Sequence, residues 1–158
     1  MRHLVLLGIA LSSLVVMPAA AVGQAGVEDA VRQSIIDSYA FGRDNLMDEA
    51  GGYSKAGSAE FWSSGGLLQW VPADTPPLSY ESNSLTPKHI KVIPLADGVA
   101  LVHMYVEGAY HATGQAPVPN YLTRGTLVVV LEEGEWVTRA AHWSPIRGGT
   151  GTNQTAID

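Results

Sequence analysis

The chain contains no cysteine. A disulfide framework, a cysteine-ligated zinc site and a thiol nucleophile are therefore excluded, and no thiol is present to carry a lipid. Basic residues are also scarce, with 9 Lys and Arg against 15 Asp and Glu and a formal net charge of −6. A chain with this charge repels phosphate backbones, so nucleic acid is not expected as a partner.

The first 25 residues carry the pattern of an export signal. Arg2 precedes an uncharged apolar run over residues 4–16, and a proline and a stretch of small residues follow it. The run is about 13 residues long, whereas a membrane-spanning helix needs about 20. Cleavage after Ala21 or after Ala25 fits the small-residue rule, and Ala25 is preferred because a helical pattern begins there. We expect residues 1–25 to be a signal peptide, the protein to be secreted or periplasmic, and no membrane span to remain after cleavage.

The rest of the chain begins with a helical pattern and ends with strand patterns. Apolar residues over 27–47 recur at three- and four-residue spacings, as on one face of an amphipathic helix, and residues 59–62 favour a second short helix. Segments dense in valine, leucine and tyrosine predict strands over 89–94, 99–110, 121–131 and 136–143. This order predicts an α+β domain over residues 26–147, in which helices cover one face of an antiparallel meander. Residues 148–158, rich in Gly, Thr and Asn, are expected to form a flexible tail.

Two hairpin turns are predicted within the meander. Asp97-Gly98 is a tight turn, and the four residues from Glu132 to Glu135 connect the last two strands. The strand over 121–131 becomes apolar on both faces near its turn, which predicts burial on both sides. A helix on one side and a second subunit on the other would satisfy this pattern.

The last two strand segments resemble a known superfamily. The sequence TRGTLVVVLEEGEW, from Thr123 to Trp136, and the closing AHWSP from Ala141 to Pro145 are similar to the last hairpin of SnoaL-like and nuclear transport factor 2-like proteins. That superfamily includes ketosteroid isomerases, polyketide cyclases and the association domain of calcium/calmodulin-dependent protein kinase II. The resemblance implies a cystatin-like cone, in which N-terminal helices pack in the concave face of a curved antiparallel sheet. It also implies a pocket between them and a homodimer formed through the convex face.

Two histidines are the candidate catalytic residues. Relatives often carry two histidines two positions apart on the last strand, and here Ala140 holds the first position, so the resemblance carries over His142 alone. Strand alternation places His142 on the side opposite Arg139, and we expect the side without the arginine to be the concave one. His103 would then oppose His142 across the cone, one as general base and the other as hydrogen-bond donor. The alternative is that both histidines are structural.

Aromatic residues and one arginine complete the predicted site. Arg124 lies in an apolar strand, where an unpaired charge is costly, so we expect an ion pair with Glu107, a carboxylate-bearing ligand or contact with solvent. Met47 and Met104 are predicted core residues. No spacing of histidines indicates a metal site, and no cofactor is expected. The predicted pocket residues are Tyr39, Trp62, Trp70, Tyr105, Tyr121, Arg124 and His142.

Three functions follow from these observations, because the implied fold hosts all of them. The first is an exported, dimeric domain that binds a small apolar or carboxylate-bearing molecule in a hydrophobic pocket. The second is an acid/base isomerase, dehydratase or cyclase that uses His142 with His103 or Tyr105, although the Asp base and the Tyr and Asp oxyanion hole of the ketosteroid isomerases are not matched. The third is an oligomerisation domain. The enzyme hypothesis requires at least two titratable side chains that point into one enclosed interior.

Overall fold

The computed structural model describes residues 24–146 and residue 149. The predicted signal peptide, apart from Gln24 and Ala25, and the predicted tail, apart from Gly149, lie outside the described residues. No helix in the described part of the chain is both long and apolar enough to cross a membrane. The elements within it are α1 (Gln24–Asn45), β1 (Ser58–Phe61), β2 (Gln69–Val71), β3 (Tyr80–Asn83), β4 (Thr86–Ala96), β5 (Val99–Ala112), β6 (Val118–Glu132) and β7 (Glu135–Pro145).

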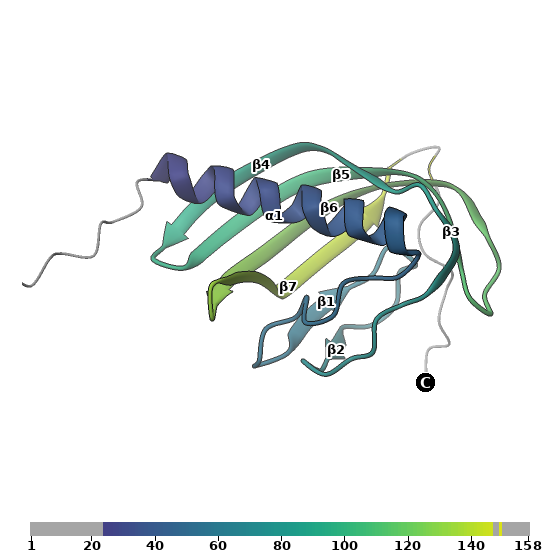
Figure 1. Ribbon diagram of the computed structural model, residues 1–158, viewed down its shortest axis with the longest axis horizontal. Coiled ribbons are helices and arrows are strands. Elements are labelled where there is room, and N and C mark those ends of the chain that lie inside the picture. Colours follow the sequence, from purple (N-terminus) through teal and green to yellow (C-terminus); the bar gives the residue numbers. More distant parts are fainter. Residues whose placement is uncertain (1–23, 147–148, 150–158) are drawn as a thin grey trace, which may run out of the picture.

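The strands form a curved sheet with α1 lying across its concave face (Figure 1). The strand order is β2-β1-β7-β6-β5-β3, and β4 also pairs with β5. β4 to β7 form the predicted antiparallel meander, whereas β1 pairs with β7 in parallel. The predicted α+β class is confirmed, with the sheet mixed rather than wholly antiparallel.

Helix α1 buries one stripe of side chains against the sheet. Val31 is fully buried in the core, and Val27, Ile35 and Tyr39 pack against the same core. These positions repeat every four residues, which places them on one side of a helix. The predicted first helix is therefore confirmed, and it is the helix that fills the concave face in the described part of the chain.

The predicted short helix over residues 59–62 is wrong. Ser58 and Glu60 are buried, and the alternate residues Ala59 and Phe61 are more exposed. This period of two is that of a strand, and β1 pairs with β7 on one side and with β2 on the other. Pairing on both sides outweighs the local helical preference of this short segment, because the ladder satisfies its backbone hydrogen-bonding groups.

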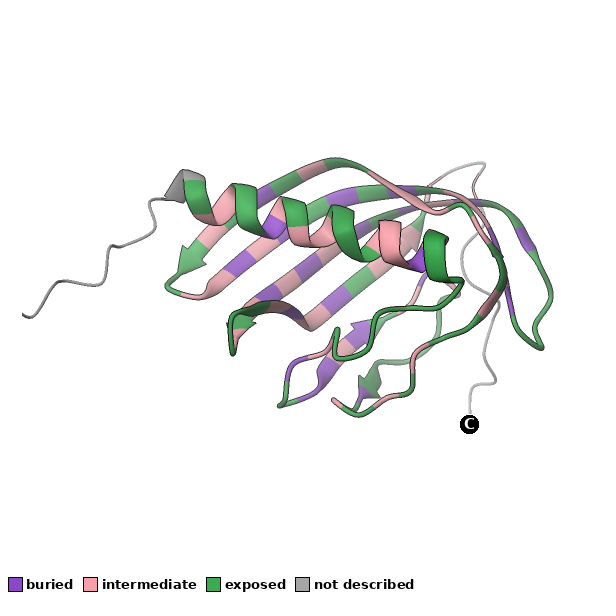
Figure 2. Cartoon of the chain, viewed as in Figure 1, coloured by how far each residue is buried: buried purple, intermediate pink, exposed green. Residues whose placement is uncertain are grey.

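The core lies between α1 and the concave face of the sheet. Burial alternates along β5 and β6, and Figure 2 shows the resulting stripes of buried residues. Met104 is 3% exposed, as predicted for a core residue, whereas Met47 is 38% exposed, so its predicted core position is wrong. The buried residues of β5 that face α1 are Ala100, Val102, Met104 and Val106.

Both predicted hairpin turns are present. Asp97 and Gly98 connect β4 to β5. At the second turn Glu132 pairs with Glu135, so the loop has two residues rather than the predicted four. Glu133 and Gly134 have φ angles of 53° and 93°, the positive values that a type I′ turn requires.

A β-bulge in β7 changes which side chains face the core. Val128 pairs with Ala140 and Val129 pairs with Thr138, so Arg139 is an extra residue in β7. Trp136 and Trp143 consequently pack against the same core, although strict alternation would place residues 136 and 143 on opposite faces. The faces of β7 beyond the bulge are therefore the reverse of those predicted from alternation.

Candidate functional site

The two candidate histidines lie on the convex face, so the prediction that they face the concave interior is wrong. Beyond the bulge Ala141 is 5% exposed and belongs to the core, which leaves the neighbouring His142 on the outside, where it is exposed. His103 pairs with Thr126, which in turn pairs with His142, so the three side chains form one row across β5, β6 and β7. The Nδ1 atom of His103 lies 2.9 Å from Thr126 Oγ1. The histidines therefore cannot act together on a molecule bound in the concave interior.

Three of the predicted pocket residues besides His142 also lie away from the interior. Tyr105 and Arg124 face each other on the convex side of β5 and β6. The Arg124 Nε donates a hydrogen bond to Ser144 Oγ at 2.9 Å, whereas Glu107 pairs with Lys88 at 3.3 Å, so the expected ion pair between Arg124 and Glu107 is wrong. Trp70, on β2, is exposed and lies beneath the Arg139 guanidinium, 5.3 Å from the ring centroid.

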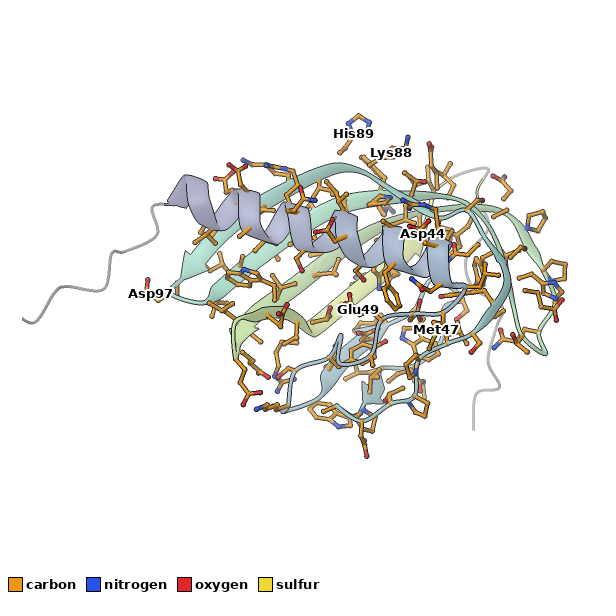
Figure 3. The ribbon with its side chains drawn as sticks, viewed as in Figure 1. Asp44, Met47, Glu49, Lys88, His89 and Asp97 are labelled. Carbon is orange, nitrogen blue, oxygen red and sulfur yellow. The ribbon has the colours of Figure 1, made fainter. Side chains whose placement is uncertain are left out.

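The other predicted pocket residues, Tyr39, Trp62 and Tyr121, come together on the concave side. Tyr39 is near the C-terminal end of α1 and interacts electrostatically with Tyr121 on β6. The hydroxyl groups of Tyr121 and Ser63 are 3.5 Å apart, and Ser63 follows Trp62 in the chain. Residues from the helix, from β6 and from the segment after β1 therefore meet in one region. Figure 3 labels Met47 and Glu49 in the segment that leads away from this end of α1.

Five of the six tyrosines in the chain gather in this region, and we call them the tyrosine cluster. The ring centroids of Tyr80 and Tyr110 are 6.0 Å apart and those of Tyr110 and Tyr121 are 5.6 Å apart, both with edge-on geometry. Edge-on packing is a favoured arrangement of aromatic rings. Tyr105 is the sixth tyrosine and lies on the opposite face of the sheet. The members of the tyrosine cluster are Tyr39, Tyr53, Tyr80, Tyr110 and Tyr121.

Two carboxyl groups adjoin the tyrosine cluster. The Tyr80 hydroxyl donates a hydrogen bond of 2.6 Å to Asp48 Oδ1. Asp48 is exposed, but partial loss of the surrounding water raises its pKa, and this hydrogen bond opposes the increase. Glu60 is 5% exposed and accepts hydrogen bonds from Ser58 Oγ at 2.8 Å and from Trp62 Nε1 at 3.0 Å. Burial raises the pKa of Glu60 as well, in spite of these two donors.

Tyr53 lies near enough to both carboxyl groups for their charges to affect its pKa. It forms a parallel bridge with Thr138 of β7, and its pKa is raised to about 12, first by burial and then by the nearby charges of Glu60 and Asp48. Burial and the neighbouring Tyr121 also raise the pKa of Tyr110 to about 12. Phenols with pKa values in this range are protonated at neutral pH and act as hydrogen-bond donors.

A buried hydroxyl lies on the same face of β6 as Tyr121. Thr123 is 0% exposed, and its Oγ1 has no hydrogen-bond partner among the described residues. Buried polar atoms are nearly always hydrogen-bonded, so this oxygen is an exception that requires an explanation. Thr123 and Tyr121 are two positions apart on one strand, which places both side chains toward the interior.

Trp143 forms part of the inner surface of the sheet beside this hydroxyl. Gly125 pairs with Trp143, and a Cβ atom at Gly125 would lie 2.5 Å from the nearest atom of the indole ring. Only a residue without a side chain allows the ring to lie this close to β6. Within the described residues, no group of three or more His, Asp or Glu side chains is placed to hold a metal ion.

No protein-family model matches the sequence, and a search of curated proteins finds no match. Solved structures do match. A candidate scytalone dehydratase from Novosphingobium aromaticivorans is 12% identical with a TM-score of 0.57, over 81% of this chain and 87% of that one. An NTF2-like protein of unknown function from Pseudomonas putida is 15% identical with a TM-score of 0.52, over 84% of this chain and 98% of that one.

These two likenesses establish the fold. The chain has the cone fold of the SnoaL-like and nuclear transport factor 2-like proteins, as the resemblance of its last hairpin predicted. An uncharacterised protein from Caulobacter vibrioides with a cystatin-like fold is also similar, at 17% identity and a TM-score of 0.48 over 75% of this chain and 88% of that one. At these identities the likeness concerns the fold alone, because one fold hosts many chemistries.

Proposed function

We propose that the domain binds a small, largely apolar molecule that carries a hydroxyl or carbonyl group, on the concave side next to the tyrosine cluster. The observation that supports this most directly is that two hydrogen-bonded carboxyl groups adjoin the tyrosine cluster: Asp48 accepts a hydrogen bond from Tyr80, and the buried Glu60 accepts one from Trp62. Aromatic faces with a few converging polar groups are typical of sites for small molecules. The Thr123 hydroxyl supplies a further hydrogen-bonding group to a molecule bound there.

Within this proposal the two carboxyl groups exchange protons with the bound molecule. A carboxyl whose pKa is raised toward neutrality gives and accepts protons more readily at that pH. The ionised group would remove a proton from carbon next to a carbonyl, and the protonated group would donate one to a departing hydroxyl, which leaves as water. This is the isomerase or dehydratase class expected from the sequence, with Asp48 and Glu60 in place of His142. The structural neighbour named as a candidate dehydratase agrees with this class, but the proposal rests on the side chains.

Binding of 2-naphthol, a neutral bicyclic phenol, tests the proposed site. Loss of one hydrogen bond in Tyr53→Phe is expected to weaken binding about 2- to 12-fold, the equivalent of about 0.5–1.5 kcal/mol. Tyr105→Phe removes the same atom on the convex face and should leave the affinity unchanged. Fluorescence titration of the two variants measures the difference. Equal affinities for Tyr53→Phe and the unchanged protein, or no binding to either, would exclude the proposed site.

We also propose that the chain is exported and that its first residues are removed. The supporting pattern is Arg2, the apolar run over 4–16 and the small residues that end at Ala25. When the full chain is expressed in a bacterial host, N-terminal sequencing of the exported protein should find Val22 or Gly26 as the first residue. Recovery of an uncleaved protein that begins at Met1 and stays in the cytoplasm would contradict the proposal.

We propose in addition that the part of the convex face nearest the two hairpin turns forms a homodimer through an apolar row. Ile93 pairs with Leu101, Leu101 with Val128, and Val128 with Ala140, so four apolar side chains follow one another across β4, β5, β6 and β7. Ile93 is 38% exposed in the single chain. Charged residues are depleted at the centre of dimer interfaces, so Val128→Lys should convert the dimer into a monomer in analytical ultracentrifugation. A monomeric unchanged protein would exclude this interface.

A further inference from the structure

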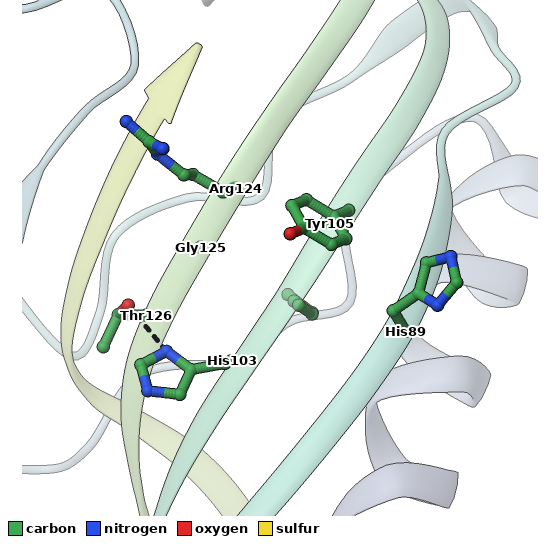
Figure 4. A pocket seen from close by; sticks show the side chains of 7 residues that line it. His89, His103, Tyr105, Arg124, Gly125 and Thr126 are labelled. Atoms are coloured by element: carbon green, nitrogen blue, oxygen red, sulfur yellow. Dashed lines mark hydrogen bonds between the residues drawn. The ribbon is translucent and has the colours of Figure 1, made fainter. Parts of the chain in front are cut away.

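A cleft of about 290 Å³ opens on the convex face beside the row of His103, Thr126 and His142 (Figure 4). It lies on the opposite side of the sheet from the tyrosine cluster and is a different site from the one proposed above. The side chains that give it chemical character come from β4, β5 and β6. They are His89, His103, Tyr105, Arg124 and Thr126.

Arg124 is the charged residue of the cleft. Its Nε is bound to Ser144 Oγ, which fixes the plane of the guanidinium, and it forms no ion pair with a carboxylate among the described residues. The terminal nitrogens of an arginine in this position keep their donors for another partner. A guanidinium matches the planar geometry of a carboxylate or phosphate with two parallel hydrogen bonds.

The neighbours of Arg124 are also able to form hydrogen bonds. Tyr105 lies directly across from Arg124 in the strand register and is 43% exposed. The His103 Nδ1 is held by Thr126 Oγ1 at 2.9 Å, so the ring is fixed and its second nitrogen is left for a ligand. Figure 4 shows Tyr105 between Arg124 and His89, the Arg124 guanidinium extending toward β7, and His103 beside Thr126.

The backbone of β4 is distorted to bring a further imidazole to the cleft. His89 has a φ of 50°, a left-handed value that is unusual for this residue, within the bulge between Lys88 and Lys91. Its ring packs edge-on against Tyr105, with centroids 5.8 Å apart. Figure 3 shows His89 and Lys88 projecting from β4 away from α1. Bulges that redirect a side chain are common beside functional sites, and this one adds a ring nitrogen to the cleft.

The cleft therefore combines a guanidinium, a phenol and two imidazoles, and no acidic residue among those described lines it. The carboxylate closest in the register, Glu107, is neutralised by Lys88. This concentration of donors contrasts with the net charge of −6 of the whole chain. Arg124 is exposed, so water satisfies it in the free protein, and an anion would gain a charge-assisted pair of hydrogen bonds there that a neutral ligand would not.

We propose that this cleft binds the anionic head group, carboxylate or phosphate, of a small organic molecule whose apolar body lies against Tyr105. Arg124 forms the paired hydrogen bonds to the anion, and Tyr105, its partner in the strand register, contacts the apolar body. The site is independent of the tyrosine cluster and of the proton chemistry proposed there.

Equilibrium dialysis of the mature protein with benzoate, phenyl phosphate and the neutral benzamide tests the site. Benzoate or phenyl phosphate should bind, and benzamide should bind about tenfold or more weakly, because it lacks the charge that a charge-assisted hydrogen bond requires. Arg124→Gln should lower the affinity for the anion by about the same factor. Arg32→Gln changes the net charge equally on the exposed surface of α1, where Arg32 pairs with Asp29, and should leave binding unchanged.

Measuring each probe with the variant of the other site distinguishes the two proposed sites. Arg124→Gln should leave 2-naphthol binding unchanged, and Tyr53→Phe should leave benzoate binding unchanged. Arg124→Lys keeps the charge but loses the planar pair of donors, so it should give an intermediate affinity and serves as a second variant. Equal anion binding by Arg124→Gln and Arg32→Gln, or benzamide binding as tight as benzoate, would overturn the proposal even if the interior site were correct.

Discussion

Alanine at position 125 tests how closely Trp143 lies on the inner surface of the sheet. The new Cβ atom would lie 2.5 Å, 2.8 Å and 2.9 Å from three atoms of the Trp143 ring, whereas ordinary contacts are 3.4–4 Å. Adding a methyl group to a packed core typically costs about 1–3 kcal/mol. The φ of Gly125 is not in the positive range, so alanine adopts this conformation without backbone strain. The lower conformational entropy of the unfolded alanine chain then stabilises the fold by about 0.4–1 kcal/mol, which offsets part of the cost. With the middle value of each range, the expected net loss is about 1.3 kcal/mol in the free energy of unfolding.

Urea denaturation followed by tryptophan fluorescence measures this loss. Gly52→Ala is the matched control, because a Cβ there would approach its nearest neighbour, the carbonyl oxygen of Glu49, no closer than 3.9 Å. The control should be as stable as the unchanged protein or more stable by about 0.4–1 kcal/mol. If Gly125→Ala were as stable as Gly52→Ala, the indole could not lie on β6 as described, and the inner surface next to Thr123 would have a different shape.

Three further predictions concern buried and hydrogen-bonded polar groups. Burial favours the protonated form of Glu60 and so raises its pKa in the folded protein. The protonated carboxyl stabilises the fold fully below the ordinary glutamate pKa of about 4.3, and this stabilisation is lost as the pH rises through the raised pKa. Glu60→Gln should therefore be more stable than the unchanged protein at pH 8 and equal to it at pH 4 in urea denaturation; a difference that does not vary with pH would contradict this. Hydrogen bonds from the Lys55 backbone N–H, at 2.8 Å, and from the Ser54 hydroxyl hold the pKa of Glu132 below its usual value. The stability that the ionised Glu132 supplies is therefore lost as the pH falls. Glu132→Gln should be less stable than the unchanged protein at pH 7, and the difference should be much smaller in acid. Thr123→Val should raise the free energy of unfolding by about 1–3 kcal/mol, because it removes the unpartnered oxygen, and a loss of stability would mean that this oxygen is bonded.

Local sequence patterns predicted most of the meander because its strands pair with their neighbours in the chain. The Asp97-Gly98 turn and the alternation along β5 and β6 can each be recognised from the local sequence. The segment at Glu60 was predicted as a helix because its partner, β7, lies about 80 residues further along, and pairing over such a separation leaves no local signal. A strand pattern over residues 58–62 would have placed Ser58, Glu60 and Trp62 on one face.

The candidate site was predictable only in part. Tyr39 and Tyr121 were identified as aromatic residues of a helix and a strand, but Tyr53, Tyr80 and Tyr110 are brought to them by the fold. The prediction for His142 failed because alternation was counted through Arg139, and the sequence does not show that Arg139 is the extra residue of a bulge. Glu60 was missed because acidic residues are usually solvated, so burial of its carboxyl becomes evident from coordinates alone. Asp48 was missed because its partner, Tyr80, lies 32 residues away in the chain.

The most direct test of the interior site is a nuclear magnetic resonance titration of the protein with 13C-labelled tyrosines against 2-naphthol. The chain offers an internal control, because Tyr105 lies on the convex face and the other tyrosines form the cluster. The account predicts that the Tyr53 and Tyr121 signals shift in proportion to bound 2-naphthol while the Tyr105 signal stays in place. A shift of Tyr105 alone, with Tyr53 and Tyr121 unchanged, would contradict it.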